Sequence, residues 1–496
     1  MPMSNGEAGA TVGRFWPPSG RGLPGWTHAA LVVVALFLLE YYWWSPKLPF
    51  NGGFGWDGVN YARWVISLPQ EVLEGSLSSY HIKRILPSFL VSLPARVLAL
   101  PVTREYIIGG FCVGNALCTY LAALFWLRLC AALKMSGPRA LLGLVLLIAN
   151  YPVLKQAAYY SVLTDLFALA SATAMLDCWV RDRRLGLAIA VLVSMFCWAS
   201  TPVLGSLLLL FPRGSTFRLG RWSRFAPGIG WLAGLAYALG ASVVGTGLLS
   251  KDPMPVPVWR GCLPVSILVA GAYVFFVART FGTTVSGGEG SPRLAGLSWA
   301  RTAAWLLLVP GVVLVQHLVA PQIFVGALDL PGLVIGSINR PGLFLVGDFT
   351  YYGTIMVLGA LFLPAVLREA GRLGLGVLGA TVFGLGLNLY PETRMSMNVL
   401  PFFVLPLILA LPGGGVNGSQ WLFVGLCQFA TSKIWLPIEA TAEDFLHSWQ
   451  DYPVQYLFAS HAPWMANDAF VVQGVLAVVA LVVAGLLFRP GEFRGR

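Results

Sequence analysis

Long apolar segments alternate with short polar ones along almost the whole chain, a pattern typical of a protein that crosses a membrane many times. An apolar run of about 20 residues is long enough to span the hydrocarbon core as a helix. Such runs cover residues 28–45, 107–133, 157–179, 226–249, 261–281, 302–325, 349–367, 372–390, 396–412, 419–435 and 469–488. We therefore expect an all-α integral membrane protein, a polytopic bundle of about 12–14 transmembrane helices.

Three regions fit this pattern less simply. Residues 140–150 form a short apolar run that ends at "NYP". Residues 186–212 are broken by "STP" (Ser200 to Pro202), and proline disfavours a continuous helix. One kinked helix and two short helices joined at the break both fit this run. Residues 82–101 contain three basic residues and three prolines, so a place at the membrane surface and a span are both compatible with the sequence.

The distribution of basic residues orients the predicted bundle. We place the N-terminus inside, residues 82–101 at the outer surface, 140–150 as a span and 186–212 as a short hairpin. The strongly basic loops then fall on the cytoplasmic side, as the positive-inside rule requires. These loops contain Lys134 and Arg139, Arg181 to Arg184, Arg213 to Arg224, and Arg368 with Arg372. This arrangement gives about 14 spans with both termini inside.

The predicted organisation is one transmembrane domain, residues 27–488, between a disordered cytoplasmic tail (1–26) and a short C-terminal tail (489–496). Two long loops lie outside in this topology, 46–81 and 436–468. An amphipathic surface helix is predicted over residues 59–74 of the first loop. Its apolar face is expected to contain Val59, Trp64, Val65, Leu68 and Val72.

Composition supports the membrane class and excludes several functions. The 496 residues are 57% hydrophobic and 11% charged, against about 25% charged in soluble domains. The net charge of +11 is accounted for by basic cytoplasmic loops, and no nucleic-acid-binding motif is present. The seven cysteines form no CxxC pair and are expected to be buried apolar residues. The chain has no Walker loop, GxSxG motif or HExxH motif, so ATP-driven transport and a zinc protease have no support.

The first outer loop contains the strongest candidate for chemistry, Asp57 in "FGWDGVNYARW". Asp-Gly is a common turn pair, so a purely structural role is one interpretation. The stretch "YHIKR" follows some 25 residues later and places His81, Lys83 and Arg84 on the same predicted face. Guanidinium and ammonium groups bind phosphate, although contact with lipid headgroups would explain them as well. The acid can accept a proton from a hydroxyl or ligate a divalent cation.

Two further acids are candidates at the outer ends of spans. Asp165 is predicted to lie about two turns into an apolar helix, where a carboxylate is costly and is either functional or a hydrogen-bond partner for another helix. Glu392 and Arg394, in "YPETR", lie between two predicted spans. They form either a local ion pair or a site in which Arg394 supplies a second phosphate contact.

These stretches together resemble the polytopic C-type (GT-C) membrane glycosyltransferases. The resemblance rests on "GWDGVNYARW", "HIKRILPSFLVSLPARVLAL", "YSVLTDLFALA", "WASTPVLGSLLLLFP" and "YPETRMSMNVLPFFVLPLI", scattered over residues 28–412. It implies transfer of a sugar from a polyprenyl phosphate or pyrophosphate. Departures from the family pattern are the lack of a doubled acid in the first loop and of a soluble C-terminal domain.

The resemblance also implies roles for individual residues. Asp57, Asp165 and Glu392 would be catalytic, and Asp57 would also be a candidate ligand for a divalent cation, Mg²⁺ or Mn²⁺. The donor phosphate would be bound by His81, Lys83, Arg84 and Arg394. Other substrate contacts would come from Trp56, Asn60, Tyr61 and Tyr160.

The expected protein is thus a glycosyltransferase with its site on the outer face of a bacterial-type inner membrane. Its expected partners are a polyprenyl-phosphate-linked sugar and a glycan, lipid or protein acceptor. Two alternatives stand beside it. One is a transporter or flippase, with Asp165 and His317 in a proton relay. The other is a polymerase or ligase of surface glycans. The sequence identifies neither the sugar nor the acceptor.

Overall fold

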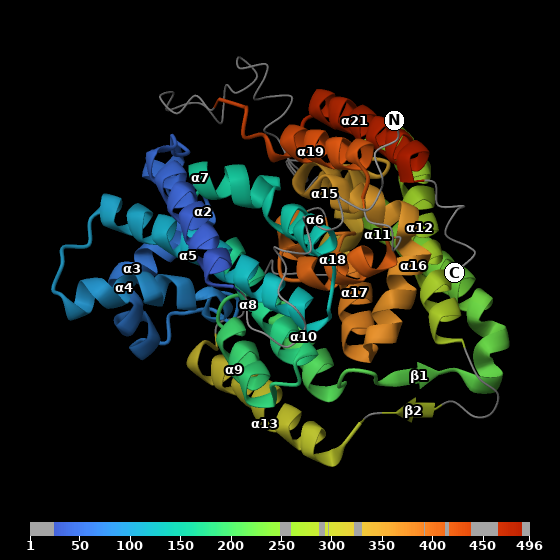
Figure 1. Ribbon diagram of the computed structural model, residues 1–496, viewed down its shortest axis with the longest axis horizontal. Helices are drawn as coiled ribbons and strands as arrows, with labels where there is room; N and C mark the ends of the chain where they lie inside the picture. Colours follow the sequence, from blue (N-terminus) through green and yellow to red (C-terminus); the bar gives the residue numbers. More distant parts are fainter. Residues whose placement is uncertain are drawn as a thin grey trace, which may run out of the picture.

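The computed structural model describes residues 24–248, 259–286, 293–295, 297–321, 330–390, 392–411, 416–437 and 465–488. Helices make up nearly all of this part of the chain, which confirms the all-α class (Figure 1). Its two strands, β1 (Thr216–Arg218) and β2 (Arg293–Ala295), pair antiparallel as a short ribbon. Most of the N-terminal tail, most of loop 436–468 and the tail 489–496 lie outside the described residues.

The helices fall in the following order. The α-helices are α2 (Gly25–Trp44), α3 (Asp57–Leu73), α4 (Leu86–Val97), α5 (Arg104–Ala132), α6 (Gly137–Ile148), α7 (Ala157–Tyr159), α8 (Asp165–Val180), α9 (Arg184–Ser194), α10 (Thr201–Leu210), α11 (Ala226–Leu248), α12 (Leu263–Val285), α13 (Trp299–Val319), α14 (Leu330–Ile338), α15 (Leu343–Tyr352), α16 (Thr354–Leu373), α17 (Leu375–Leu387), α18 (Leu400–Ala410), α19 (Gly418–Ser432) and α21 (Asn467–Phe488). Short 3₁₀ or π turns are η1 (Phe50–Gly53), η2 (Ile82–Arg84), η3 (Pro152–Gln156), η4 (Gly220–Phe225), η6 (Arg260–Cys262) and η7 (Thr393–Ser396).

The chain is a multi-pass integral membrane protein. Six of the described helices, α2, α5, α12, α13, α16 and α21, are long and apolar enough to cross a membrane. The bent pair 137–148 and 152–159 would make a seventh span. Six further apolar helices of 10–17 residues are shorter than a full span. All seven cysteines are free and buried or half-buried, as predicted.

The structure resolves the three ambiguous regions and corrects two predicted spans. Residues 186–212 form two short helices, α9 and α10, and 82–101 contain the turn η2 and the short helix α4. Residues 140–150 belong to α6 and the break that follows it in the bent pair. The predicted span 349–367 is divided between α15 and α16 at Gly353, whose φ of 61° interrupts the helix.

The predicted span 157–179 is also broken, because residues 160–164 are not helical. The Ser161 carbonyl accepts a hydrogen bond from the Asn115 side chain (2.9 Å), and the Tyr159 carbonyl accepts one from the Leu48 amide (2.8 Å). Tertiary bonds therefore satisfy groups that a helix would have used. Asp165 consequently begins α8, and the prediction that it lies two turns inside a helix is wrong.

The surface helix predicted over 59–74 is α3, packed against α4 at one side of the molecule (Figure 1). Trp64, Val65 and Leu68 are buried as expected, but Val59 and Val72 are exposed. The buried face includes Tyr61, and a residue two positions away lies on the opposite side of a helix. The predicted position of Val59 on that face is therefore wrong.

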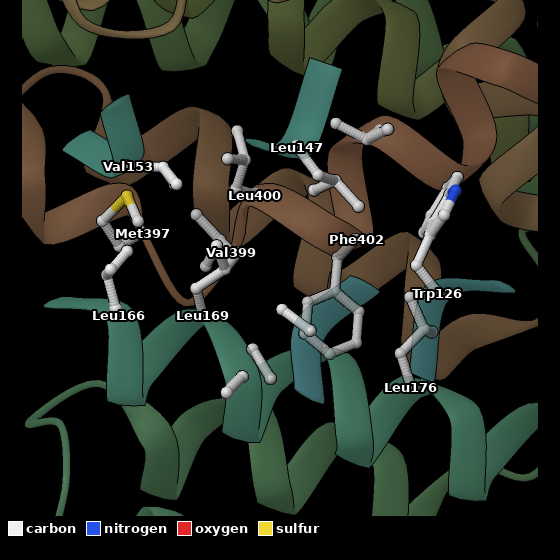
Figure 2. Close-up of a cluster of buried hydrophobic side chains, with 14 of the residues drawn as sticks. Trp126, Leu147, Val153, Leu166, Leu169, Leu176, Met397, Val399, Leu400 and Phe402 are labelled. Atoms are coloured by element: carbon white, nitrogen blue, oxygen red, sulfur yellow. The ribbon is translucent and has the colours of Figure 1, made fainter. Parts of the chain in front are cut away.

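Buried apolar side chains pack α8 against the segment that joins η7 to α18. Leu166 and Leu169 of α8 face Met397 and Val399, and Phe402 continues the same contact (Figure 2). These side chains are buried, and inside a membrane such contacts hold helices together by close van der Waals packing. Because Asp165 directly precedes Leu166 and Arg394 lies three residues before Met397, this contact fixes one part of the site relative to the other.

Basic loops gather at one end of the bundle, here called the basic end (residues 134–139, 181–184, 211–218 and 372–374). Arg139 donates to the Leu411 carbonyl (2.6 Å), and the Gly214 amide donates to the Leu373 carbonyl (2.8 Å). Arg301 pairs with Asp182 at 3.3 Å. Loops 211–218 and 372–374, which the charge rule assigns to the same side of the membrane, are thus in direct contact.

Candidate functional site

Asp57 is the first residue of α3, where a tyrosine from a distant segment binds the helix end. The Tyr160 hydroxyl accepts hydrogen bonds from the amides of Asp57 (3.0 Å) and Gly58 (3.4 Å). A negative charge at a helix N-terminus is also stabilised by the helix dipole. Asp57 is thereby held in place by backbone contacts that leave its carboxylate available to other groups.

Glycines let Tyr160 approach this closely. A Cβ on Gly55, whose φ is +69°, would lie 2.5 Å from the Tyr160 ring. A Cβ on Gly58 would lie 2.9 Å from the Val162 carbonyl oxygen. The sequence "GWDG" therefore brackets Asp57 with two residues whose missing side chains make room for its neighbours.

Arg84, from η2, is fully buried beside Asp57. Its guanidinium lies 3.8 Å from the Asp57 carboxylate and donates to the Tyr61 hydroxyl (3.1 Å). The rings of Tyr80 and Trp198 lie on it, each 4.5 Å from the guanidinium carbon. Its Nη2 contacts the Met395 sulfur at 3.4 Å, and its Nε has no hydrogen-bond partner. The Arg84 guanidinium has five N–H donors, and its neutral and aromatic neighbours do not provide acceptors for all of them.

Arg394, from η7, joins two carboxylates. Its Nη2 bonds the Asp57 carboxylate and its Nε bonds Glu392. Its side chain is 13% exposed, so both bonds are largely shielded from water. The structure thus brings together residues 57, 84, 392 and 394 in one cluster of two acids and two guanidinium groups, here called the charged cluster.

The charges around Asp57 determine its protonation. Burial raises the pKa of the Asp57 carboxyl, but the guanidinium groups of Arg394 and Arg84 more than offset this effect, and the pKa is lowered. Burial and the charge of Arg63 lower the pKa of His81. His81 packs its ring edge-on against Trp64 and Tyr80 at the border of the cluster.

Asp165 lines a small pocket next to the charged cluster. The pocket has room for about one water molecule and is lined by Asn115, Pro152, Gln156, Ala157, Tyr160, Leu163, Asp165 and Leu166. Asp165 is buried, and neither carboxylate oxygen has a hydrogen-bond partner in the described protein. It interacts electrostatically with Arg394 and Arg84. The pocket therefore presents an unsatisfied acceptor within range of both cations.

Other residues that the sequence predicted for the site lie outside the charged cluster. Trp56 is exposed and contacts the rings of Phe50 and Tyr160. Lys83 and Asn60 are half-buried, and no ion pair or hydrogen bond to Asp57 is found for them among the described residues. His317 is exposed on α13, whereas Asp165 is buried in the pocket. The proton relay proposed from these last two residues is not assembled in this arrangement.

Three residues that contact Arg84 were not identified from the sequence: Tyr80, Trp198 and Met395. Trp198 comes from the break between α9 and α10, and its indole N–H donates to the Met395 carbonyl (3.4 Å). Aromatic residues at the ends of apolar runs are usually interface anchors, which conceals such a role. The break at "CWASTP" could have indicated Trp198. Irregular backbone at membrane depth occurs only where it is buried in protein or lines a cavity.

The two carboxylates nearest the expected cation site are both bonded to Arg394. Arg394 lies between Asp57 and Glu392 and occupies acceptors that a cation would need. Within the described ranges, no three His, Cys, Asp or Glu side chains gather closely enough to hold a metal ion.

Two structures of the oligosaccharyltransferase from Archaeoglobus fulgidus resemble this chain remotely. One is the archaeal enzyme AglB in complex with an inhibitory peptide and a dolichol-phosphate, with 11% identity, a TM-score of 0.39, and coverage of 91% of this chain and 56% of that one. The apo form has 11% identity, a TM-score of 0.40, and coverage of 94% and 55%. The chain spans about half the length of both structures. No protein-family model and no curated protein matches the sequence.

Proposed function

We propose that the protein is a membrane glycosyltransferase that transfers a sugar from a polyprenyl-phosphate or pyrophosphate donor to an acceptor hydroxyl. The observation that carries the proposal is Arg84, a fully buried guanidinium 3.8 Å from Asp57 with an unbonded Nε. A buried cation without a full set of acceptors is suited to an anionic ligand, and the guanidinium fork matches phosphate oxygens. A lipid-linked donor also suits a site built at the ends of membrane helices.

In the proposed reaction, a bond forms between the acceptor oxygen and the anomeric carbon, while the bond from that carbon to the phosphate oxygen breaks. Arg84 and Arg394 bind the phosphate and stabilise the negative charge that it takes up on leaving. Asp57 accepts the proton of the acceptor hydroxyl. Asp165, unsatisfied in the adjoining pocket, orients the sugar or the acceptor by accepting its hydroxyl hydrogen bonds.

The charged cluster also suggests how the base becomes active. Arg394 bonds the Asp57 carboxylate and helps keep its pKa low, so in this state Asp57 is a weak base. A donor phosphate that draws Arg394 away from Asp57 would raise the pKa of that carboxyl. Donor binding would then prepare the base, and the acceptor would be deprotonated only when the donor is present.

Following the charge rule, we place this cluster on the extracytoplasmic face of a bacterial-type inner membrane. A lipid phosphate can be moved across a membrane, whereas nucleotide sugars stay in the cytoplasm. Labelling a single cysteine introduced at the exposed residue Glu74, in a background without the native cysteines, tests this placement. Modification of intact cells by a membrane-impermeant maleimide is expected, and modification only after lysis would reverse the topology.

The decisive experiment incubates the purified full-length protein with polyprenyl-phosphate sugars and a panel of glycan and lipid acceptors. Asp57→Asn is expected to reduce transfer by about 10²–10⁴-fold, the range for loss of a general base. Glu74→Gln, which removes an exposed acid at the other end of α3, serves as the control. Transfer by Asp57→Asn at the wild-type rate would refute the assigned role. Consumption of a lipid-linked oligosaccharide would instead indicate a polymerase or ligase, and uptake without a covalent product would indicate a transporter.

A further inference from the structure

A second buried cation, Lys433, lies on a segment that the proposed reaction does not use. It directly follows α19 and is 1% exposed. Its ammonium group makes no hydrogen bond in the described protein and instead lies 4.3 Å from the centre of the Tyr151 ring. An aromatic face compensates a buried charge only in part, because an ammonium group has three donors to satisfy.

The backbone of Lys433 is unfavourable as well. Its φ is +55°, the left-handed conformation in which helices usually end on glycine or asparagine. A lysine is therefore retained where glycine would fit the backbone better and would bury no charge. Lys433 thus combines a buried charge without a hydrogen bond and an unfavourable backbone conformation. Two such costs at one residue indicate a functional role more than a structural one.

Lys155, from η3, reaches the same turn. Its buried ammonium group donates to the Leu436 carbonyl at 2.5 Å, and the Leu436 amide donates to the Lys433 carbonyl at 3.0 Å. Residues 433–436 thus form a turn that carries one ammonium group and is bound by another. Lys155 retains two N–H donors beyond this bond.

Aromatic and amide side chains connect this turn to the pocket of Asp165. The Tyr151 ring beneath Lys433 packs edge-on against Tyr351, with ring centres 5.1 Å apart. The Tyr351 hydroxyl donates to the Gln156 side chain at 2.6 Å, and Gln156 lines the pocket. The pocket is therefore linked through Asp165 to Arg84 and Arg394, and through Gln156, Tyr351 and Tyr151 to Lys433.

We propose that Lys433 and Lys155 bind an anionic group, carboxylate or phosphate, on the acceptor substrate. In the proposed function Arg84 and Arg394 supply the site for the donor phosphate, so a separate cationic site linked to the same pocket suits the second substrate. The identification of that substrate as the acceptor rests on the proposed glycosyl transfer, whereas the anion site itself does not. The acceptor class is then an acidic glycan or a phosphorylated lipid.

A binding experiment tests this assignment without requiring transfer. The full-length protein in detergent is titrated calorimetrically with methyl glucuronide, with the uncharged methyl glucoside, and with decyl phosphate as a probe of the donor site. Wild type is expected to bind the glucuronide at least tenfold more tightly than the glucoside. Lys433→Met is expected to abolish that preference and to leave decyl phosphate binding unchanged, while Arg394→Met has the reverse pattern.

Matched variants distinguish loss of the Lys433 charge from disturbance of the protein fold. Lys134→Met removes a lysine with the same positive φ from an exposed position at the basic end and should change neither titration. Lys433→Gly keeps the backbone conformation and should behave as Lys433→Met, and Lys433→Arg should restore part of the preference.

Three results would overturn the assignment. Equal affinity of wild type for the two glycosides would remove the anion site. An unchanged preference in both Lys433→Gly and Lys433→Met would remove Lys433 from it. Loss of decyl phosphate binding in the Lys433 variants would assign these lysines to the donor. A positive binding result in a protein that transfers no sugar would keep the anion site and refute only the proposed function.

Discussion

The two ends of the bundle pair arginine with aspartate in opposite ways. At the basic end, Asp177 is completely buried, and its partners Arg128 and Arg181 are 30% and 27% exposed. At the charged cluster, Arg84 is completely buried, and its partner Asp57 is the more exposed member at 33%. Arg128 and Arg181 can be hydrated, so that pairing is a local way to satisfy an acid. Arg84 cannot be hydrated, and the proposed anion site at the charged cluster rests on this difference.

Arginine substitutions at the two ends give the largest expected contrast. Arg84→Gln and Arg394→Gln are each expected to reduce kcat/KM for transfer by about 30-fold or more, because losing a buried charged contact costs about 2–5 kcal/mol. Arg181→Gln, at the basic end, is expected to stay within about twofold of wild type. Initial rates over a range of donor concentrations check this prediction. Equal losses at both ends would mean that the comparison reflects folding alone.

A glycine substitution should disturb the charged cluster through Tyr160. Gly55→Ala places a methyl group against the Tyr160 ring and should displace the start of α3, lowering transfer by about tenfold, which corresponds to about 1.4 kcal/mol. Gly75→Ala is the matched control, since Gly75 has a similar φ of +62° but open space at the Cβ position. Both variants carry similar backbone strain, so a rate difference between them isolates the contact with Tyr160. Equal rates would show that this contact does not position Asp57.

The pH dependence of transfer should reveal the low pKa of Asp57. A carboxyl whose folded pKa is lowered contributes stability above its unfolded pKa, and that contribution is lost as pH falls through the folded pKa. Activity limited by the same group should likewise persist through neutral pH and decline only below the usual Asp pKa of about 3.9. In Arg394→Gln the acid limb of kcat/KM should move to higher pH, by up to about 1–3 units. An unmoved limb would assign the titration to another group.

Metal removal is expected to have the smallest effect. Arg394 already neutralises Asp57 and Glu392, so treatment with EDTA should leave the transfer rate within about twofold of the untreated enzyme. Atomic emission analysis of the purified protein provides an independent measurement. A loss of activity that Mg²⁺ or Mn²⁺ restores would show that the two acids separate from Arg394 during turnover.

Hydrophobic pattern predicted the class of fold and most helix positions, because burial in a membrane imposes long apolar runs that one sequence displays directly. It also predicted that residues 186–212 could divide at the "STP" break. The break at residues 160–164 has no such local signal. It arises because Asn115 and Leu48 bind carbonyls that a helix would otherwise use, and those partners are distant in sequence.

The candidate site was predictable as separate stretches and not as an assembly. Residues 57, 84, 392 and 394 were each singled out by an unusual charge near the end of an apolar run. Nothing in one sequence shows that Arg394 reaches Asp57, which lies 337 positions earlier. Trp198 and Tyr80 were missed because an aromatic residue at a membrane surface usually needs no partner.

The wide separation of these residues has a consequence for biosynthesis. Arg84 is synthesised early, but Trp198 and Met395, which cover it, and Arg394, which shares Asp57 with it, come much later. Chains are made and begin to fold from the N-terminus. The segment that contains Asp57 and Arg84 is therefore expected to keep its charges hydrated until η7 has been synthesised. A nascent chain halted before residue 390 should have an accessible Arg84, and only the completed chain should exclude water from it.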